Sequence, residues 1–87
     1  MDPYDMAQKA IADLKSAICA LLRAGPSEGM SNAKIGRTLG IYMGHKRHVG
    51  HIPRTLLAIL EKDGLVVQDP KKLWRLCGRL AAKGQAQ

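Results

Sequence analysis

Three histidines recur at every third position in the middle of the chain, at His45, His48 and His51. Two cations, Lys46 and Arg47, stand between the first two of them. Neutral imidazole is a good zinc ligand, so this spacing raises the question of a metal site. A zinc site needs further ligands that converge in tetrahedral geometry, but neither cysteine is near in sequence and the two cations would flank the ion. We therefore expect no bound metal and no cofactor; the plainest alternative is a loop with exposed histidines.

The sequence shows little that is typical of a catalytic site. It contains no HExxH and no Gly-rich phosphate loop, and its match to GxSxG, GPSEG at 25–29, reads as a loop that follows the first helix. The two cysteines, Cys19 and Cys77, lie far apart among apolar neighbours, which favours reduced thiols in or near a core. The seven acidic residues show no pairing on one face. We therefore expect that the chain is not an enzyme on its own.

Positive charge is concentrated after residue 30. The net charge is +7: residues 1–30 hold three Lys or Arg against four Asp or Glu, whereas residues 31–87 hold eleven against three. This asymmetry predicts an acidic partner, with nucleic acid as the first candidate, and the alternative is a charge that serves solubility. The basic stretch 44–51 would add to such a surface, and its histidines would strengthen binding below about pH 6.5, where they become charged.

Length and composition predict one small domain. Hydrophobic residues make up 46% of 87 residues, which suits a single core built mainly from aliphatic side chains. We expect this domain to span residues 1–83, followed by a disordered tail at 84–87. The N-terminus lacks a basic leader region, and no apolar run reaches the roughly 18 residues of a membrane span. We expect no membrane partner and an intracellular location, cytoplasmic or nucleoid-associated.

Apolar periodicity and end signals predict three helices. A period near 3.6 indicates a first helix from about Pro3 to Arg23, with a polar outer face that gives no sign of a dimer. The second is expected at about Ser31–Leu39, and Gly36 within it indicates close approach by another helix. The third begins near Ile52 or Pro53 and ends before Gly64, after an irregular connection at 40–50 that is an enlarged turn or holds an extra helical turn.

The end of the chain reads as a β-hairpin, with strands at 65–68 and 73–76 around an Asp-Pro-Lys-Lys turn. The expected core combines this hairpin with the helices. On the third helix, a wheel places Ile52, Leu56, Ile59 and Leu60 on the buried side, with Leu57 at its margin. The full expected core is Leu14, Ile18, Leu21, Ile35, Leu39, Leu56, Ile59, Leu60, Val66 and Trp74.

Three stretches together resemble the winged helix-turn-helix family, over about residues 6–77. They are MSNAKIG at 30–36, IPRTLLAILEKDGLV at 52–66 and LWRL at 73–76. The resemblance implies a mainly α fold with a small β-hairpin, here a three-helix winged helix-turn-helix with an enlarged turn between helices 2 and 3. It also implies that Met30 adds a short strand to the wing. Many members place the third helix in the major groove of duplex DNA; others are protein-interaction modules, so docking of an acidic protein is the alternative function.

The DNA-binding interpretation gives each candidate residue a role. Arg54 and Thr55 are expected near base edges, because Arg can read guanine and Thr can meet a thymine methyl group or a phosphate. The other candidates are polar or basic residues expected near the backbone: Asn32, Lys34, Arg37, His45, Lys46, Arg47, Lys62, Lys71 and Lys72. An ordinary solvated surface is the alternative for these side chains. The target sequence, the choice between DNA and RNA, the oligomeric state, the biological pathway and the ordering of the His-rich loop stay open.

Overall fold

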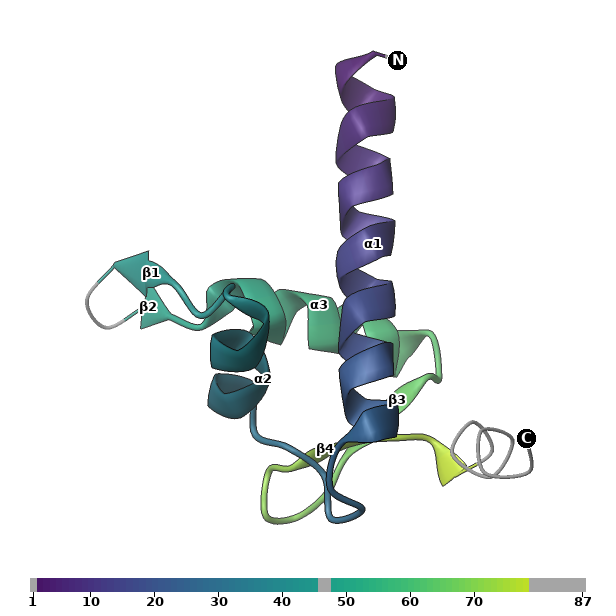
Figure 1. Cartoon of the computed structure of the whole chain (residues 1–87), viewed down its shortest axis with the longest axis vertical. Helices are drawn as coiled ribbons and strands as arrows, with labels where there is room; N and C mark the ends of the chain where they lie inside the picture. The colour runs from purple at the N-terminus through teal and green to yellow at the C-terminus, as the bar shows by residue number, and fades with distance from the viewer. Residues whose placement is uncertain (1, 46–47, 79–87) are drawn as a thin grey trace.

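Helices form most of this protein, and two short antiparallel hairpins complete it (Figure 1). The structure is a computed structural model and describes residues 2–45 and 48–78. The elements are, in chain order, α1 (Pro3–Ala24), α2 (Asn32–Leu39), β1 (Gly44–His45), β2 (His48–Val49), α3 (His51–Lys62), β3 (Val66–Gln68) and β4 (Trp74–Leu76). The predicted mainly α class with a small hairpin is confirmed, and the element order is compatible with a winged helix. The tail expected at 84–87 lies outside the described residues.

The first two helices begin and end where their sequence signals predict. The Asp2 carboxylate accepts the backbone N–H of Asp5 at 2.8 Å and caps α1, whose first residue is Pro3. Ser31 caps α2 in the same way by accepting the N–H of Lys34 at 3.1 Å. Gly40 ends α2 with a φ of 74°, a left-handed conformation that favours glycine. Local hydrogen bonding at the caps therefore sets these boundaries.

The connection between α2 and α3 contains a β-hairpin, which the sequence analysis did not predict. In place of the expected irregular chain or extra helical turn, β1 pairs with β2 in the register Gly44↔Val49 and His45↔His48. A Lys-Arg pair, residues 46–47, separates the strands in sequence in place of the Asn-Gly or Asp-Gly that usually marks a tight hairpin. Strands of two residues are also too short to show alternation, so the pattern carried no signal.

The buried face of α3 differs from the predicted one. Pro53, Leu56, Leu57 and Leu60 are buried, whereas Ile52 and Ile59 are 36% and 37% exposed. At 100° per residue this is a rotation of about 60° from the expected orientation. The cause is α2, which crosses α3 at Pro53: a Cβ added to Gly36 would lie 2.9 Å from the Pro53 ring. Placing Ile59 in the core was therefore wrong.

The C-terminal hairpin agrees with prediction, and Met30 pairs with its free edge. β3 pairs with β4 in the register Val66↔Leu76, and Met30 bridges the other edge of β4 at Trp74. Two backbone hydrogen bonds, of 2.9 and 2.7 Å, join Met30 to Trp74 in both directions. The strand at Met30, implied by the winged-helix resemblance, is thus present as a single bridge.

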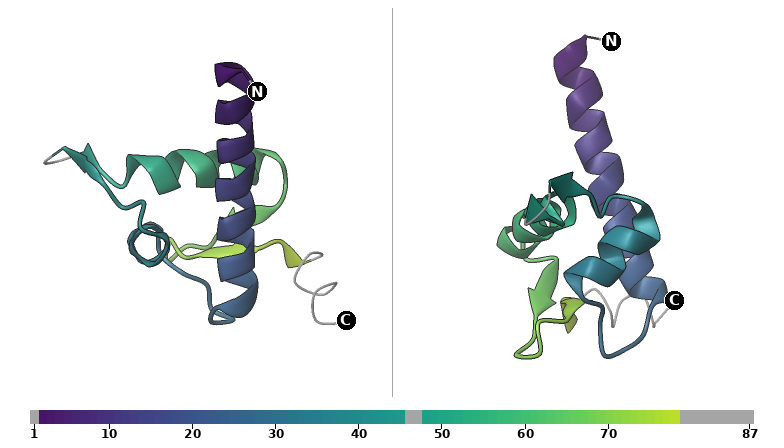
Figure 2. Two further views of the ribbon diagram at one scale, coloured as in Figure 1. Left: turned by 45° about the horizontal axis from the view of Figure 1, so that its top comes forward. Right: turned by 90° about the vertical axis from the view of Figure 1, so that its left-hand side faces the viewer.

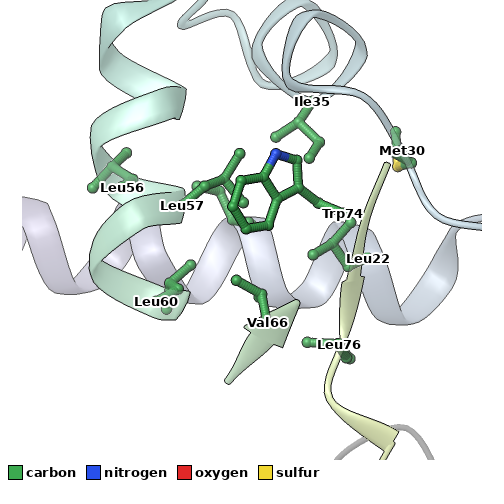
Figure 3. Close-up of a cluster of buried hydrophobic side chains, with 10 residues drawn as sticks. Leu22, Met30, Ile35, Leu56, Leu57, Leu60, Val66, Trp74 and Leu76 are labelled. Carbon is green, nitrogen blue, oxygen red and sulfur yellow. The ribbon is translucent and has the colours of Figure 1, made fainter. Parts of the chain in front are cut away.

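One hydrophobic core joins all three helices to this wing. Trp74 lies at its centre, with its indole ring between Ile35 of α2 and the side chains of α3 and β3 (Figure 3). The interpretation of Trp74 as a core residue is therefore confirmed. The buried cluster is Ile18, Leu22, Met30, Ile35, Leu56, Leu57, Leu60, Val66, Trp74 and Leu76, and the predicted Leu14, Leu21 and Leu39 are half-buried at its edge.

Candidate nucleic-acid interface

The solvent face of α3 lies opposite its buried leucines. Arg54, Thr55 and Lys62 are exposed, as the sequence predicts, and Ala58 is exposed between them. The β1–β2 hairpin extends beyond the N-terminal end of α3 in line with the helix (Figure 1). The described part of the hairpin therefore leaves the exposed face of α3 open to a partner.

The wing tip has a defined conformation and carries two exposed lysines. The Asp69 carboxylate accepts the backbone N–H groups of Lys71 and Leu73, at 2.8 and 2.9 Å. Lys72 adopts a left-handed conformation with a φ of 67°, and its carbonyl accepts the Gln68 side chain at 3.3 Å. Two backbone hydrogen bonds of 2.9 Å, from the Asp69 N–H to the Leu73 carbonyl and from the Lys72 N–H to the Asp69 carbonyl, close the same turn. Both lysine side chains are exposed as a result.

α3 and the wing lie on the same side of the molecule, with α2 on the other (Figure 2, right). Within residues 2–45 and 48–78, salt bridges join only Lys9 to Asp13 and Lys15 to Asp63. The candidate cations on α2, α3 and the wing are therefore not neutralised by a carboxylate in the described part of the chain. Unpaired cations near one surface attract a polyanion more strongly than paired ones.

α2 contributes one open cation and one that is partly engaged. Lys34 is exposed in the first turn, near the positive end of the helix. The Arg37 guanidinium lies over the Tyr42 ring, 4.7 Å from its centroid, in a cation–π contact. Arg37 remains exposed, so the ring orients its side chain without burying it.

Asn32 supports the structure, a role that the sequence does not reveal. Its side-chain amide donates to the backbone carbonyl of Gly50 at 3.3 Å and ties the start of α2 to the start of α3. Its Oδ1 atom is buried and has no hydrogen-bond partner among the described residues. The structure therefore gives no support to the expected phosphate contact. Gly50 adopts a φ of 82°, a conformation that favours glycine. The glycine at this position is therefore the sequence signal that could have indicated the contact between the starts of α2 and α3.

Tyr42 is the other residue whose importance the sequence did not reveal. Its ring packs between two glycines: a Cβ at Gly36 would lie 2.8 Å from Tyr42 Cβ, and one at Gly50 would lie 2.7 Å from Tyr42 Cε1. The close approach predicted at Gly36 is confirmed, and both Tyr42 and Pro53 make it. This packing fixes the angle between α2 and α3.

The histidines fall in two different settings. His51 is the exposed first residue of α3, while His45 and His48 are paired opposite each other in the backbone register of the hairpin. The side chains of His45 and His48, and Lys46 and Arg47 entirely, lie outside the described part. Among the residues that the structure describes, no three His, Cys, Asp or Glu side chains gather as a metal site. The expectation that no zinc is bound stays a prediction.

Comparison with known proteins adds no assignment: no family model, no curated protein and no solved structure matches this chain. The helices that the structure describes include none that is both long and apolar enough to cross a membrane. Arguments about function therefore depend on the geometry and charge of the surface itself.

Proposed function

We propose that this chain binds nucleic acid, with duplex DNA favoured, through the solvent face of α3 and the β3–β4 wing. The observation that carries the proposal is that exposed cations of α3 and the wing, which lie on one side of the molecule, have no carboxylate partner in the described part of the chain. They include Arg54, Lys62, Lys71 and Lys72, and α2 adds Lys34 and Arg37 on the other side. Each such cation that meets a phosphate releases a condensed counterion, which favours binding.

Position along α3 divides the contacts into two classes. Arg54 and Thr55 lie in the first turns of a 12-residue helix, and the B-DNA major groove is about 12 Å wide, enough to admit such an element. We assign Arg54 and Thr55 to base edges. Lys71 and Lys72 are exposed on the wing turn, and a lysine ammonium group interacts with phosphate through its charge. We therefore assign both to phosphates.

The β1–β2 hairpin extends this surface beyond α3. Its sequence, GHKRHV at 44–49, is basic, and the ribbon continues past the N-terminal end of α3 (Figure 1). If a duplex lies along α3, its sugar-phosphate backbone would contact the hairpin. We assign phosphate contacts, which depend on charge and not on base sequence, to this segment.

Salt-dependent binding tests the proposal directly. Fluorescence anisotropy with labelled duplex DNA should give a log–log salt slope of about −0.9 for each phosphate contacted. Lys71→Ala should weaken binding to all sequences alike and reduce the slope by about one contact. Lys9→Ala is the matched control, because Lys9 lies on α1 and is already paired with Asp13 at 2.7 Å.

Arg54→Ala separates base reading from phosphate contact. On a preferred duplex selected from a random library, it should lose about 1–3 kcal/mol and relax discrimination at one base pair. No binding to duplex, single strand or RNA at low salt would overturn the proposal. The same cations would then favour docking of an acidic protein, the alternative function.

A further inference from the structure

The N-terminal half of α1 extends away from the rest of the protein (Figures 1 and 2). Every residue from Asp2 to Asp13 is exposed, whereas the second half of the helix packs on α3 and the wing. The free part of α1 is about 16 Å long at 1.5 Å per residue. It adds nothing to the core of its own chain, so its sequence pattern needs another explanation.

One apolar stripe runs along the whole of α1. Tyr4, Ala7, Ile11, Leu14 and Ile18 follow one another at intervals of three, four, three and four residues, the spacing of a helix-packing seam. Exposure of the large side chains falls along the stripe, from 71% at Tyr4 to 37% at Ile11 and 0% at Ile18. The stripe that packs into the core at Ile18 therefore continues as an exposed apolar surface at the N-terminal end of α1. This exposed end can contact a partner although the outer face of α1 is polar.

The free stripe continues into a shallow apolar groove between α1 and α3. Ile11 and Leu14 form one wall. Ile52 and Ile59, the two residues that the rotation of α3 leaves exposed, form the other, with Thr55 between them at the edge of the solvent face of α3. The groove has a volume of about 300 Å³. The stripe and the groove make one continuous apolar surface, from Tyr4 to Ile59.

Charged side chains lie on the other side of the free helix. Lys9 and Asp13 form their salt bridge there, pointing away from Ile11. The free part of the stripe therefore carries no charged side chain with which to hold a polyanion. It suits a partner with an equally apolar helix.

We propose that this surface binds a second copy of the chain, with the two α1 helices antiparallel about a two-fold axis. A two-fold interface uses the same patch on both subunits, so Tyr4 of each copy packs at Ile11 and the groove of the other. The residues at the outer end of the stripe thus fill the groove at its inner end.

Burial fixes the register of this pairing. Ile18 is fully covered by its own core, so no partner side chain can reach it. Pairing centred on Ile11 would place Tyr4 opposite Ile18 and is excluded. Pairing Tyr4 with Ile11 places the axis beside Ala7, whose small side chain permits close approach of the helices.

Charge agrees with a second copy as the occupant. Residues 1–30 carry a net charge of −1, so contact through α1 joins nearly neutral segments and keeps the strongly basic parts of the two copies apart.

The available area predicts a weak dimer. A buried aromatic side chain covers about 150–250 Å², and Tyr4 retains 71% exposure, so it dominates the patch. With three partly exposed isoleucines and a polar rim, the two copies together would bury on the order of 1,000 Å², at the lower end for specific interfaces. We expect a dissociation constant of micromolar or weaker.

Sedimentation equilibrium without nucleic acid tests the dimer, from about 1 µM to about 1 mM protein. The unmodified chain should pass from monomer to dimer over this range. Tyr4→Glu should weaken association at least tenfold and leave the fold intact, because Tyr4 is exposed in the first turn. Met6→Glu is the matched control: Met6 is 58% exposed on the same helix, away from the stripe, and its change should have no effect.

Cross-linking tests the register. Ala7→Cys should form a 7–7 cross-link with a short bis-maleimide, identified by mass spectrometry, while Lys9→Cys on the opposite side should not. A monomer at every concentration, equal effects of Tyr4→Glu and Met6→Glu, or equal cross-linking at both positions would overturn the proposal. None of these measurements uses nucleic acid, so they stand apart from the test of DNA binding.

Discussion

Replacing two neighbouring apolar residues of α3 by alanine tests how this helix is oriented. Leu57 is completely buried in the core, whereas Ile59, two residues further on, is 37% exposed. The apolar pattern of the sequence alone predicts the opposite burial, with Ile59 in the core and Leu57 at its margin. Leu57→Ala and Ile59→Ala therefore give opposite rankings under the two orientations.

The burial of each side chain sets the expected loss. Leu57→Ala removes three buried carbons and leaves a cavity that the packed core closes only in part, which should cost about 3–5 kcal/mol. Ile59→Ala removes partly hydrated carbons and opens no closed cavity. At about 0.8 kcal/mol per fully buried methylene, less the better helix propensity of alanine, we expect about 1 kcal/mol or less.

Thermal and urea unfolding measure this difference. A domain of 87 residues is stable by about 4–13 kcal/mol, and 1 kcal/mol changes its melting temperature by about 4–8 °C. Leu57→Ala should therefore lower the melting temperature by more than about 12 °C. The protein should be kept near 1 µM, where the proposed dimer dissociates and does not add stability at Ile59. Ile52→Ala, at 36% exposure, is the control and should resemble Ile59→Ala. Equal losses at Leu57 and Ile59, or a larger one at Ile59, would refute the orientation.

Two further substitutions and one alkylation reaction test the contact between α2 and α3, the wing turn and the burial of Cys19. Gly36→Ala should destabilise the protein by about 1–3 kcal/mol, because the new methyl group meets Tyr42 Cβ at 2.8 Å, whereas the exposed Thr38→Ala in the same helix should be neutral or slightly stabilising in urea unfolding. Asp69→Ala should cost about 1–2 kcal/mol by removing the acceptor of two backbone N–H groups, and Asp69→Asn should retain most of that stability. Partial burial raises the pKa of the Cys19 thiol, an effect that nearby positive charges only partly oppose, so iodoacetamide near pH 8 should modify it several-fold more slowly in the folded protein than in denaturant. Equal rates in both conditions would contradict that account.

Elements set by local chemistry could be predicted from the sequence. Ser31 and Gly40 bound α2 through a side-chain cap and a left-handed residue, and both effects act within one helical turn. The wing follows from the alternation of its strands and from the turn at Asp69. Arg54 and Thr55 are exposed in either orientation of α3, so the sequence alone could place them on the solvent face.

Features set by contacts between elements could not be predicted. The orientation of α3 depends on Pro53 packing against α2, and a helical wheel of α3 alone contains no information about α2. The five isoleucine and leucine side chains of α3 cover a wide arc of the helix, so the apolar pattern fits two orientations. The role of Asn32 likewise depends on a hydrogen bond to Gly50, 18 residues away.

The joint between α2 and α3 explains how the connection between these two helices can hold a hairpin. The Gly50 N–H donates to the Met43 carbonyl at 3.0 Å, so the hairpin is closed at its base. The Ile41 N–H donates to Gly36 at 2.8 Å, and Asn32 holds the carbonyl of Gly50 from the side of α2. Because these bonds bring the two ends of the hairpin together at α2, the extra residues lie outside the packing that sets the angle between α2 and α3. A closed insertion of this kind adds little loop-closure entropy. The protein can therefore place a basic segment beside α3 without altering the core that orients α3.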